Sequence, residues 1–239
     1  DCIIACHNWP EIPEGKIGIN FETIMAGCNA FKIEVKGRGG HGAMPNESID
    51  PLFTAIQIVN SLQGIMTRIK RPLDAAVMSV CKIQCGETYN VIADKAEIEG
   101  TVRTFSDEVT DLIETKMVQI ATQVGTAFGA EVTVNFVRRV PPVSNSAKYV
   151  QALKEAACEV FGSESVCLQS PVMPSEDFGV FLKHCPGALF FIGNGSGEHR
   201  QEGHGPGPCA LHNPSYDFND SILPVGAAVF VKTVENYLA

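Results

Sequence analysis

The stretch FKIEVK at residues 31–36 alternates apolar and charged side chains, which is the period-two pattern of a strand with one buried face. From Ile49 the apolar residues recur at steps of three and four behind an Asp50-Pro51 helix start, so a helix is expected next. Further strands are expected at 75–83 and 96–105, then a helix at 107–128 and a strand at 131–137. This order predicts a split βαβ, ferredoxin-like unit, in which four antiparallel strands carry both helices on one face.

The residues from 96 to 103 assign the two faces of that sheet. Ala96, Ile98, Gly100 and Val102 share one face, so Arg103 is expected on the other face, away from the helices. After Pro141-Pro142 the pattern changes to a helix at 148–161, a buried strand at 188–192 and a closing helix at 222–238. The intervening loop, 193–214, is rich in Gly, Pro and His, and so long a loop is typical of a functional segment.

The composition is that of an acidic globular protein. The 239 residues are 45% hydrophobic and 19% charged, and 18 Lys and Arg against 27 Asp and Glu give a formal net charge of -9. This balance disfavours a nucleic acid or an anionic membrane as partner. The nine cysteines are an odd, scattered set without a nucleophile signature, so we expect reduced thiols in a cytoplasmic protein, most of them small core residues.

Three of the six histidines stand at probable strand ends or in constrained turns, namely His7, His41 and His212. Neutral imidazole is the commonest metal ligand in proteins, although any one of these histidines alone is more typical of a structural side chain. The segment SEDF at 175–178 places Glu176 and Asp177 together, where either carboxylate could bind a cation or tune a neighbouring His. The alternative, compatible with the first, is a helix start with Ser175 as N-cap.

Two other site types have weaker support. His199, His204, Cys209 and His212 could form a structural zinc site, but their spacing is irregular for one and solvated loop histidines are the better interpretation. The segment GRGG at 37–40 lacks the GK[ST] of a P-loop, which excludes a phosphate-binding loop of that type.

Eight short motifs, taken together and in order, resemble the M20 peptidase group, in particular its hippurate hydrolase and indole-acetyl-amino-acid hydrolase branch. They are HNWP at 7–10, PEG at 13–15, GGHGA at 39–43, DP at 50–51, NVI at 90–92, GTVR at 100–103, SEDF at 175–178 and LHNP at 211–214. The resemblance implies a partial two-metal aminopeptidase-like α/β catalytic domain with an inserted ferredoxin-like lid that mediates dimerisation. The expected domains are then 1–28 and 143–239, as parts of the catalytic domain, and 29–142 as the lid.

The resemblance also assigns residues. His7 and His212 fall on metal-ligand positions for two divalent ions (Zn, Mn, Co or Ni). His41 falls on the lid histidine that reaches the partner subunit's active site and stabilises the oxyanion. Asn90 and Arg103 fall on substrate-contacting positions, and we also expect Glu176 and Asp177 at the substrate. The implied reaction is hydrolysis of an N-acyl amino acid or dipeptide-like substrate by metal-bound water, in a homodimer without nucleic-acid or membrane partners.

The chain departs from the family pattern in one large respect. A Cys and a His ligand and a pair of Glu residues, expected upstream of His7, are not in these 239 residues, so this chain alone is expected to be inactive. The alternative is a non-catalytic dimerisation or ligand-binding module without the metal site. Asn46, where the branch often has His, and Ala93, where Pro usually follows Asn-Val-Ile, leave the acyl and amino-acid specificity open.

Overall fold

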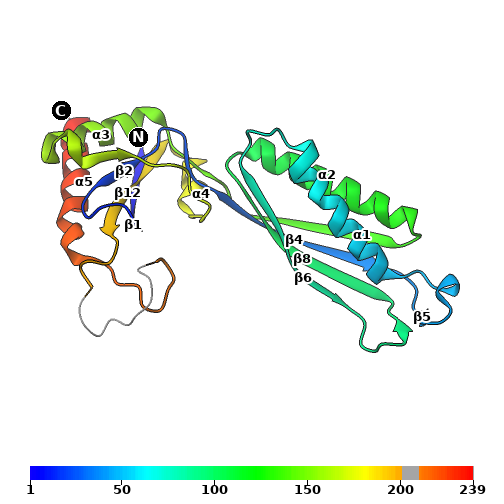
Figure 1. Cartoon of the computed structure of the whole chain (residues 1–239). Coiled ribbons are helices and arrows are strands. Elements are labelled where there is room, and N and C mark those ends of the chain that lie inside the picture. The colour runs from blue at the N-terminus through cyan, green and yellow to red at the C-terminus, as the bar shows by residue number, and fades with distance from the viewer. Residues whose placement is uncertain (201–209, 239) are drawn as a thin grey trace. The chain divides into compact units, whose positions relative to one another are not determined.

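A computed structural model describes residues 1–200 and 210–238 (Figure 1). Its contacts divide the chain into two compact units. Unit 1 is Asp1–Met25 with Val143–Ala239, and unit 2 is Ala26–Pro142.

Unit 2 is a four-stranded antiparallel sheet with two helices on one face (Figure 1). In spatial order the strands are β6 (Ala76–Cys85), β8 (Lys95–Thr104), β4 (Gly27–Lys36) and β9 (Glu131–Val140). The helices are α1 (Pro51–Gly64), which continues as a π-helical turn at Ile65–Ile69, and α2 (Asp107–Ala127). The chain order β4, α1, β6, β8, α2, β9 confirms the split βαβ prediction, and β4, β6 and β9 are longer than the sequence pattern indicated.

The core of unit 2 lies between the sheet and the helices. Ile33, Ile98 and Val102 of the strands are fully buried against Ile58 and Ile113 of the helices. The alternation of β8 places Glu97, Glu99, Thr101 and Arg103 on the opposite, partly exposed face, as the sequence predicted.

Local signals explain where the two helices begin. The Asp50 carboxylate accepts hydrogen bonds from the backbone N–H groups of Leu52 (2.9 Å) and Phe53 (3.1 Å), which confirms the predicted start of α1. At α2 the Ser106 hydroxyl accepts from the Val109 N–H at 3.3 Å. The chain leaves α2 through Gly129, whose φ of +76° suits glycine.

Unit 1 contains a mixed four-stranded sheet with both faces covered. In spatial order its strands are β1 (Ile3–Pro10), β12 (Gly187–Gly195), β2 (Ile17–Ile19) and β11 (Val166–Leu168). One face packs against α3 (Ala147–Phe161) and α5 (Leu223–Leu238), and the other packs against the short α4 (Phe178–Leu182). Strand β12 is therefore buried along its whole length.

The predicted helix at 148–161 and strand at 188–192 are both present in unit 1, and Gly162 follows α3 with a φ of +82°. The shortest strands were not predicted, because two or three residues are too few to show a period. They include β3 (Thr23–Met25), β10 (Val143–Ser144), β5 (Gly40–His41) and β7 (Val91–Ile92).

Two properties of the described residues bear on the sequence predictions. No described helix is both long and apolar enough to cross a membrane. The prediction that most cysteines are core residues is wrong for the eight described thiols, since none is fully buried. Cys2, Cys85 and Cys167 only border the cores, because they lie at strand ends or on outer strands, where packing is incomplete.

Candidate active site

The first group of candidate residues lies where β1 and β12 end. These two strands are parallel, with His7 opposite Phe191 and Trp9 opposite Gly193, so their carboxyl ends reach the same edge of the sheet. That edge is where open α/β sheets bind their ligands. The Trp9 ring stacks on Phe191 with a centroid distance of 4.3 Å, and the His7 ring lies edge-on to Trp9 at 5.9 Å. The imidazole is thereby supported from one side.

The backbone determines which nitrogen of His7 carries the proton. Its Nδ1 lies 2.6 Å from the carbonyl oxygen of Asn8. A carbonyl can only accept, so Nδ1–H is the donor and the lone pair of the neutral ring is on Nε2. That Nε2 lies 4.0 Å from Oε2 of Glu176, and the two side chains are 30% and 27% exposed. His7 thus presents the ring form that binds metal ions, next to a carboxylate that a ligand can reach.

Glu176 is held immediately before α4. Its Oε1 accepts a hydrogen bond from the Asp177 N–H at 2.9 Å. Partial burial raises the pKa of the Glu176 carboxyl and a hydrogen bond with the Asp177 side chain raises it further, while the hydrogen bond from the Asp177 backbone N–H opposes both effects. The alternative that Ser175 caps a helix is wrong: α4 begins only at Phe178, and the buried Ser175 hydroxyl has no hydrogen-bond partner among the residues that the structure describes. The Glu176 carboxylate satisfies the Asp177 amide instead.

Replacing Glu176 tests this electrostatic environment. Because the pKa is raised in the folded state, the ionised carboxylate lowers the stability of the fold at neutral pH, and this loss disappears as the pH falls below the ordinary range of a glutamate. We therefore expect Glu176→Gln to raise the melting temperature of the chelator-treated chain at neutral pH and to have less effect at acid pH. Glu155→Gln, on the exposed face of α3, is the matched control. A melting temperature lowered at neutral pH would contradict the expectation.

The loop that carries His212 is built on an asparagine turn. Asn213 Oδ1 accepts from the Ser215 N–H at 2.8 Å, and the Asn213 carbonyl accepts from the Tyr216 N–H at 2.9 Å. His212 precedes this turn with a φ of +64°, a left-handed conformation that is uncommon for a residue other than glycine. Such strain is typical of residues that a site holds in place.

The same loop is tied to the ends of β1 and β12. The Asn8 side-chain amide donates to the Tyr216 hydroxyl. Asn194, which is fully buried at the end of β12, donates from Nδ2 to the Asp217 carbonyl (3.0 Å) and accepts the Asn219 N–H at Oδ1 (2.9 Å). These anchors were not identified from the sequence, because an Asn near the end of a strand gives no signal of its distant hydrogen-bond partner.

His212 itself is exposed, and its ring has no hydrogen bond or ion pair with another described residue. Within residues 1–200 and 210–238, no group of three or more His, Cys, Asp and Glu side chains is arranged to hold a metal ion. The structure therefore brings His7 and Glu176 together and leaves His212 apart from them. Two members of the alternative zinc site, His204 and Cys209, lie outside the described residues.

The second group of candidates lies in unit 2, on a two-residue strand pair. His41 in β5 is opposite Val91 in β7, and the Gly42 N–H donates to the Asn90 carbonyl at 2.9 Å. The tertiary structure thus places His41 beside Asn90. The Asn90 side chain accepts a hydrogen bond from the Thr88 hydroxyl at 3.0 Å.

The neutral ring of His41 carries its proton on the other nitrogen from that of His7. The Ala43 N–H donates to His41 Nδ1 at 3.0 Å. A backbone N–H can only donate, so Nδ1 carries no proton and the neutral ring has its N–H at Nε2. The residue is exposed. His41 therefore presents a hydrogen-bond donor to the solvent, whereas His7 presents a lone pair.

Arg103 lies on the face of the sheet away from the helices, at the end of the row that Glu97, Glu99 and Thr101 form along β8. Its guanidinium donates to the Thr101 hydroxyl and to the Val102 carbonyl. The side chain is partly exposed, and its fork is shaped for a carboxylate.

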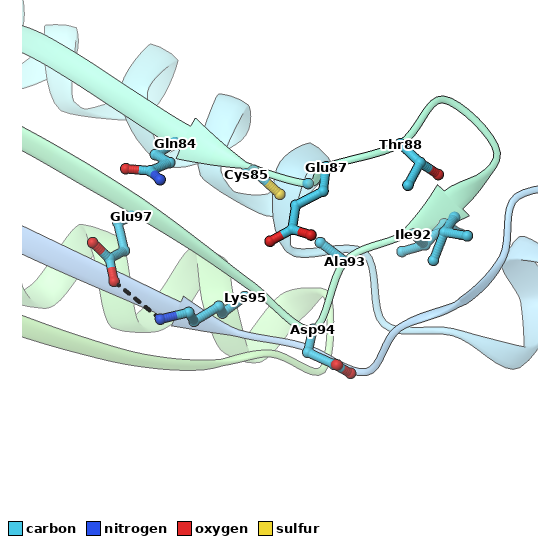
Figure 2. A pocket seen from close by; sticks show the side chains of 11 residues that line it. Gln84, Cys85, Glu87, Thr88, Ile92, Ala93, Asp94, Lys95 and Glu97 are labelled. Atoms are coloured by element: carbon cyan, nitrogen blue, oxygen red, sulfur yellow. Dashed lines mark hydrogen bonds and ion pairs between the residues drawn. The ribbon is translucent and has the colours of Figure 1, made fainter.

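Two cavities adjoin these groups. One, of about 520 Å³, lies between the ends of β6 and β8 under the 86–94 hairpin; Figure 2 shows Glu87 inside it and the Lys95–Glu97 ion pair on its wall. The other, of about 370 Å³, is lined by Cys6, His7 and Asn8 and by apolar residues of α5 and the segment before it. Cys6 is exposed, but neighbouring groups partly desolvate its thiol and raise the pKa, which disfavours the thiolate that a nucleophilic cysteine needs.

Comparison with known proteins identifies the class to which this fold and these motifs belong. The family model described as Peptidase family M20/M25/M40 matches residues 1–236. The chain therefore belongs to this family, as its motifs predicted.

Three similar proteins illustrate the range of the family. The chain is 33% identical to an N-acetylcysteine deacetylase of Bacillus subtilis, over 96% of this chain and 57% of that protein. It is 32% identical to the hippurate hydrolase of Campylobacter jejuni, over 100% of this chain and 60% of that protein. A Bacillus subtilis M20 peptidase whose structure is described as dinuclear metal binding has a TM-score of 0.80 at 27% identity, over 98% of this chain and 56% of that one. The chain thus spans little more than half the length of these proteins.

Proposed function

We propose that this chain is part of a metal-dependent amidohydrolase that cleaves the amide bond of N-acyl amino acids. The family and the activities named for its relatives support an amide hydrolase. The observation that carries the proposal is the contrast between two histidines: His7 offers a lone pair beside a carboxylate, and His41 offers an N–H. Amide hydrolysis uses both functions, because the carbonyl oxygen must be polarised and its developing negative charge stabilised.

The donor set around His7 fits a divalent cation. Imidazole nitrogen and carboxylate oxygen suit Zn, Mn, Co or Ni, and both groups are partly exposed. We assign His7 and His212 as metal ligands, and Glu176 and Asp177 to the neighbouring substrate site. When bound, two divalent ions supply Lewis acidity toward a carbonyl and lower the pKa of water. The described residues provide only part of two ligand sets, and the remaining ligands are assigned to residues other than those that the structure describes.

Substrate recognition and the oxyanion are assigned to unit 2. Arg103 would pair with the carboxylate of the N-acyl amino acid, and the Asn90 amide would hydrogen-bond to the substrate. His41 Nε2–H would donate to the oxyanion in the partner subunit. Exposed apolar side chains on α1, namely Leu52 (44%), Phe53 (48%) and Ile56 (43%), support a homodimer through this unit.

Product release tests the reaction. The purified native protein, with its intact mass and metal content determined, is incubated with hippurate and with N-acetylcysteine in the presence of Mn²⁺ or Zn²⁺. We expect release of the free amino acid, abolished by a chelator and restored by metal. Binding of these compounds without hydrolysis, by a protein that takes up no metal, would contradict the proposal and favour a non-catalytic ligand-binding module.

Metal binding by this chain tests the role of His7 separately. Titration calorimetry with Zn²⁺ or Mn²⁺ alone is expected to show an affinity that falls by at least ~10-fold in His7→Ala, since a nitrogen ligand is lost. His184→Ala removes an exposed histidine at the end of α4 and serves as the control. Equal affinities of wild type and His7→Ala would contradict the assignment of His7.

A further inference from the structure

We propose that Asp94 is the positioning residue that holds His41 in its Nε2–H form. The inference rests on the proposed function, which gives the His41 N–H its role. Asp94 makes two hydrogen bonds to the glycine-rich turn that carries His41: Oδ1 accepts the Gly39 N–H at 2.9 Å, and the carbonyl oxygen accepts the Gly37 N–H at 2.8 Å. It is therefore bonded to the turn through both its side chain and its backbone.

These bonds are the first in a continuous series that ends at the imidazole. They place residues 37–39 against residues 92–94, and the next residues form the β5–β7 pair, with Gly40 opposite Ile92 and His41 opposite Val91. The Gly42 N–H then bonds to the Asn90 carbonyl. With the strands paired in this register, the Ala43 N–H donates a hydrogen bond to His41 Nδ1.

The glycines of the turn show how closely its backbone packs against residues 49 and 90–92. A Cβ at Gly37 would lie 2.1 Å from the Ile49 carbonyl oxygen, and one at Gly39 would lie 2.7 Å from the Ile92 carbonyl oxygen. A Cβ at Gly42 would lie 2.9 Å from the Asn90 carbonyl oxygen. The turn therefore lies directly on the neighbouring backbone, and the Asp94 carboxylate is the side chain that satisfies the Gly39 N–H there.

The charged side chains next to Asp94 in the sequence do not draw its carboxylate away from the Gly39 N–H. In Figure 2 it points away from Lys95 and Glu97, whose side chains form an ion pair with each other at 3.3 Å. Asp94 is thus an acceptor for the turn, and Lys95 is paired with another carboxylate.

The test measures the His41–Ala43 hydrogen bond directly by NMR on the ¹⁵N-labelled chain. A scalar coupling through the hydrogen bond between the Ala43 amide nitrogen and His41 Nδ1 is expected in the wild type and lost in Asp94→Ala. Asp94→Asn keeps an acceptor at Oδ1 and is expected to restore the coupling. Glu87→Gln, in the same hairpin, is the matched control and is expected to leave it unchanged. Persistence of the coupling in Asp94→Ala would overturn the proposal.

Two further measurements keep the test decisive. If Asp94→Ala does not fold, the proposal is tested by hydrogen exchange of the Gly39 amide in the wild type. Slow exchange is expected because this N–H is bonded to Asp94, and exchange as fast as that of an unprotected amide would overturn the proposal. In the form of the protein that hydrolyses N-acyl amino acids, Asp94→Ala is expected to lower kcat on the order of 10-fold with little change in KM, and Asp94→Asn to restore it. The coupling does not depend on hydrolysis, so an inactive protein that retains it contradicts the proposed function and not the role of Asp94.

Discussion

Gly100→Ala is expected to lower the stability of unit 2 by about 3 kcal/mol or more and its melting temperature by roughly 10 °C. A Cβ at this position would lie 2.3 Å from Cζ of Phe31 and 2.3 Å from the carbonyl oxygen of Ser79. Phe31 is 3% exposed on the neighbouring central strand, and Ser79 belongs to the paired strand β6, so neither group has room to move. Thermal or denaturant unfolding followed by circular dichroism measures the loss.

Gly64→Ala provides the matched control for this substitution. Gly64 is the last residue of α1, and a Cβ there would have no atom within 4 Å. Alanine favours the helical backbone by up to about 1 kcal/mol relative to glycine, so this variant is expected to be slightly more stable than the wild type. Equal stability of the Gly100 and Gly64 variants would show that the close approach of Phe31 to β8 is not needed for the fold.

His41→Ala is expected to lower kcat by about 100-fold or more, which is the effect of removing one donor to an oxyanion. The residue is exposed and its ring bonds only to Ala43 among the described residues, so the fold should be unaffected. The measurement is steady-state hydrolysis of hippurate by whichever form of the protein is active. His184→Ala, at the exposed end of α4, should leave kcat unchanged.

Two outcomes are informative for His41. An unchanged kcat in His41→Ala would contradict the role of its Nε2–H in the reaction. If His41 acts in the partner subunit, mixing inactive His41→Ala with an inactive His7→Ala variant should restore part of the activity, since mixed dimers would contain one intact site. If mixed dimers form and no activity is restored, the result would contradict a role of His41 in the active site of the partner subunit.

The elements of unit 2 could be predicted from the sequence because each is long and has a clear period. The alternation at 31–36 and 96–105 shows the buried face of β4 and β8 directly, and Asp50 marks the start of α1 through a local hydrogen bond. Short strands such as β5 and β7 could not be predicted in this way. They form because distant residues are brought together, and no two-residue segment indicates that by itself.

The sequence by itself determined the split βαβ order, the placing of Arg103 on the face away from the helices, and membership in the M20 family through its motifs. Only the tertiary structure decided which nitrogen of each histidine carries its proton, because that depends on the backbone group that lies against Nδ1: a carbonyl at His7 and an amide at His41. Only the tertiary structure shows that His7 lies next to Glu176 and that Asp94 accepts a hydrogen bond from Gly39, because the residues of each pair are far apart in the chain. The sequence shows that a histidine can donate or accept a hydrogen bond at either ring nitrogen, and the backbone group next to Nδ1 in the folded chain determines which nitrogen donates.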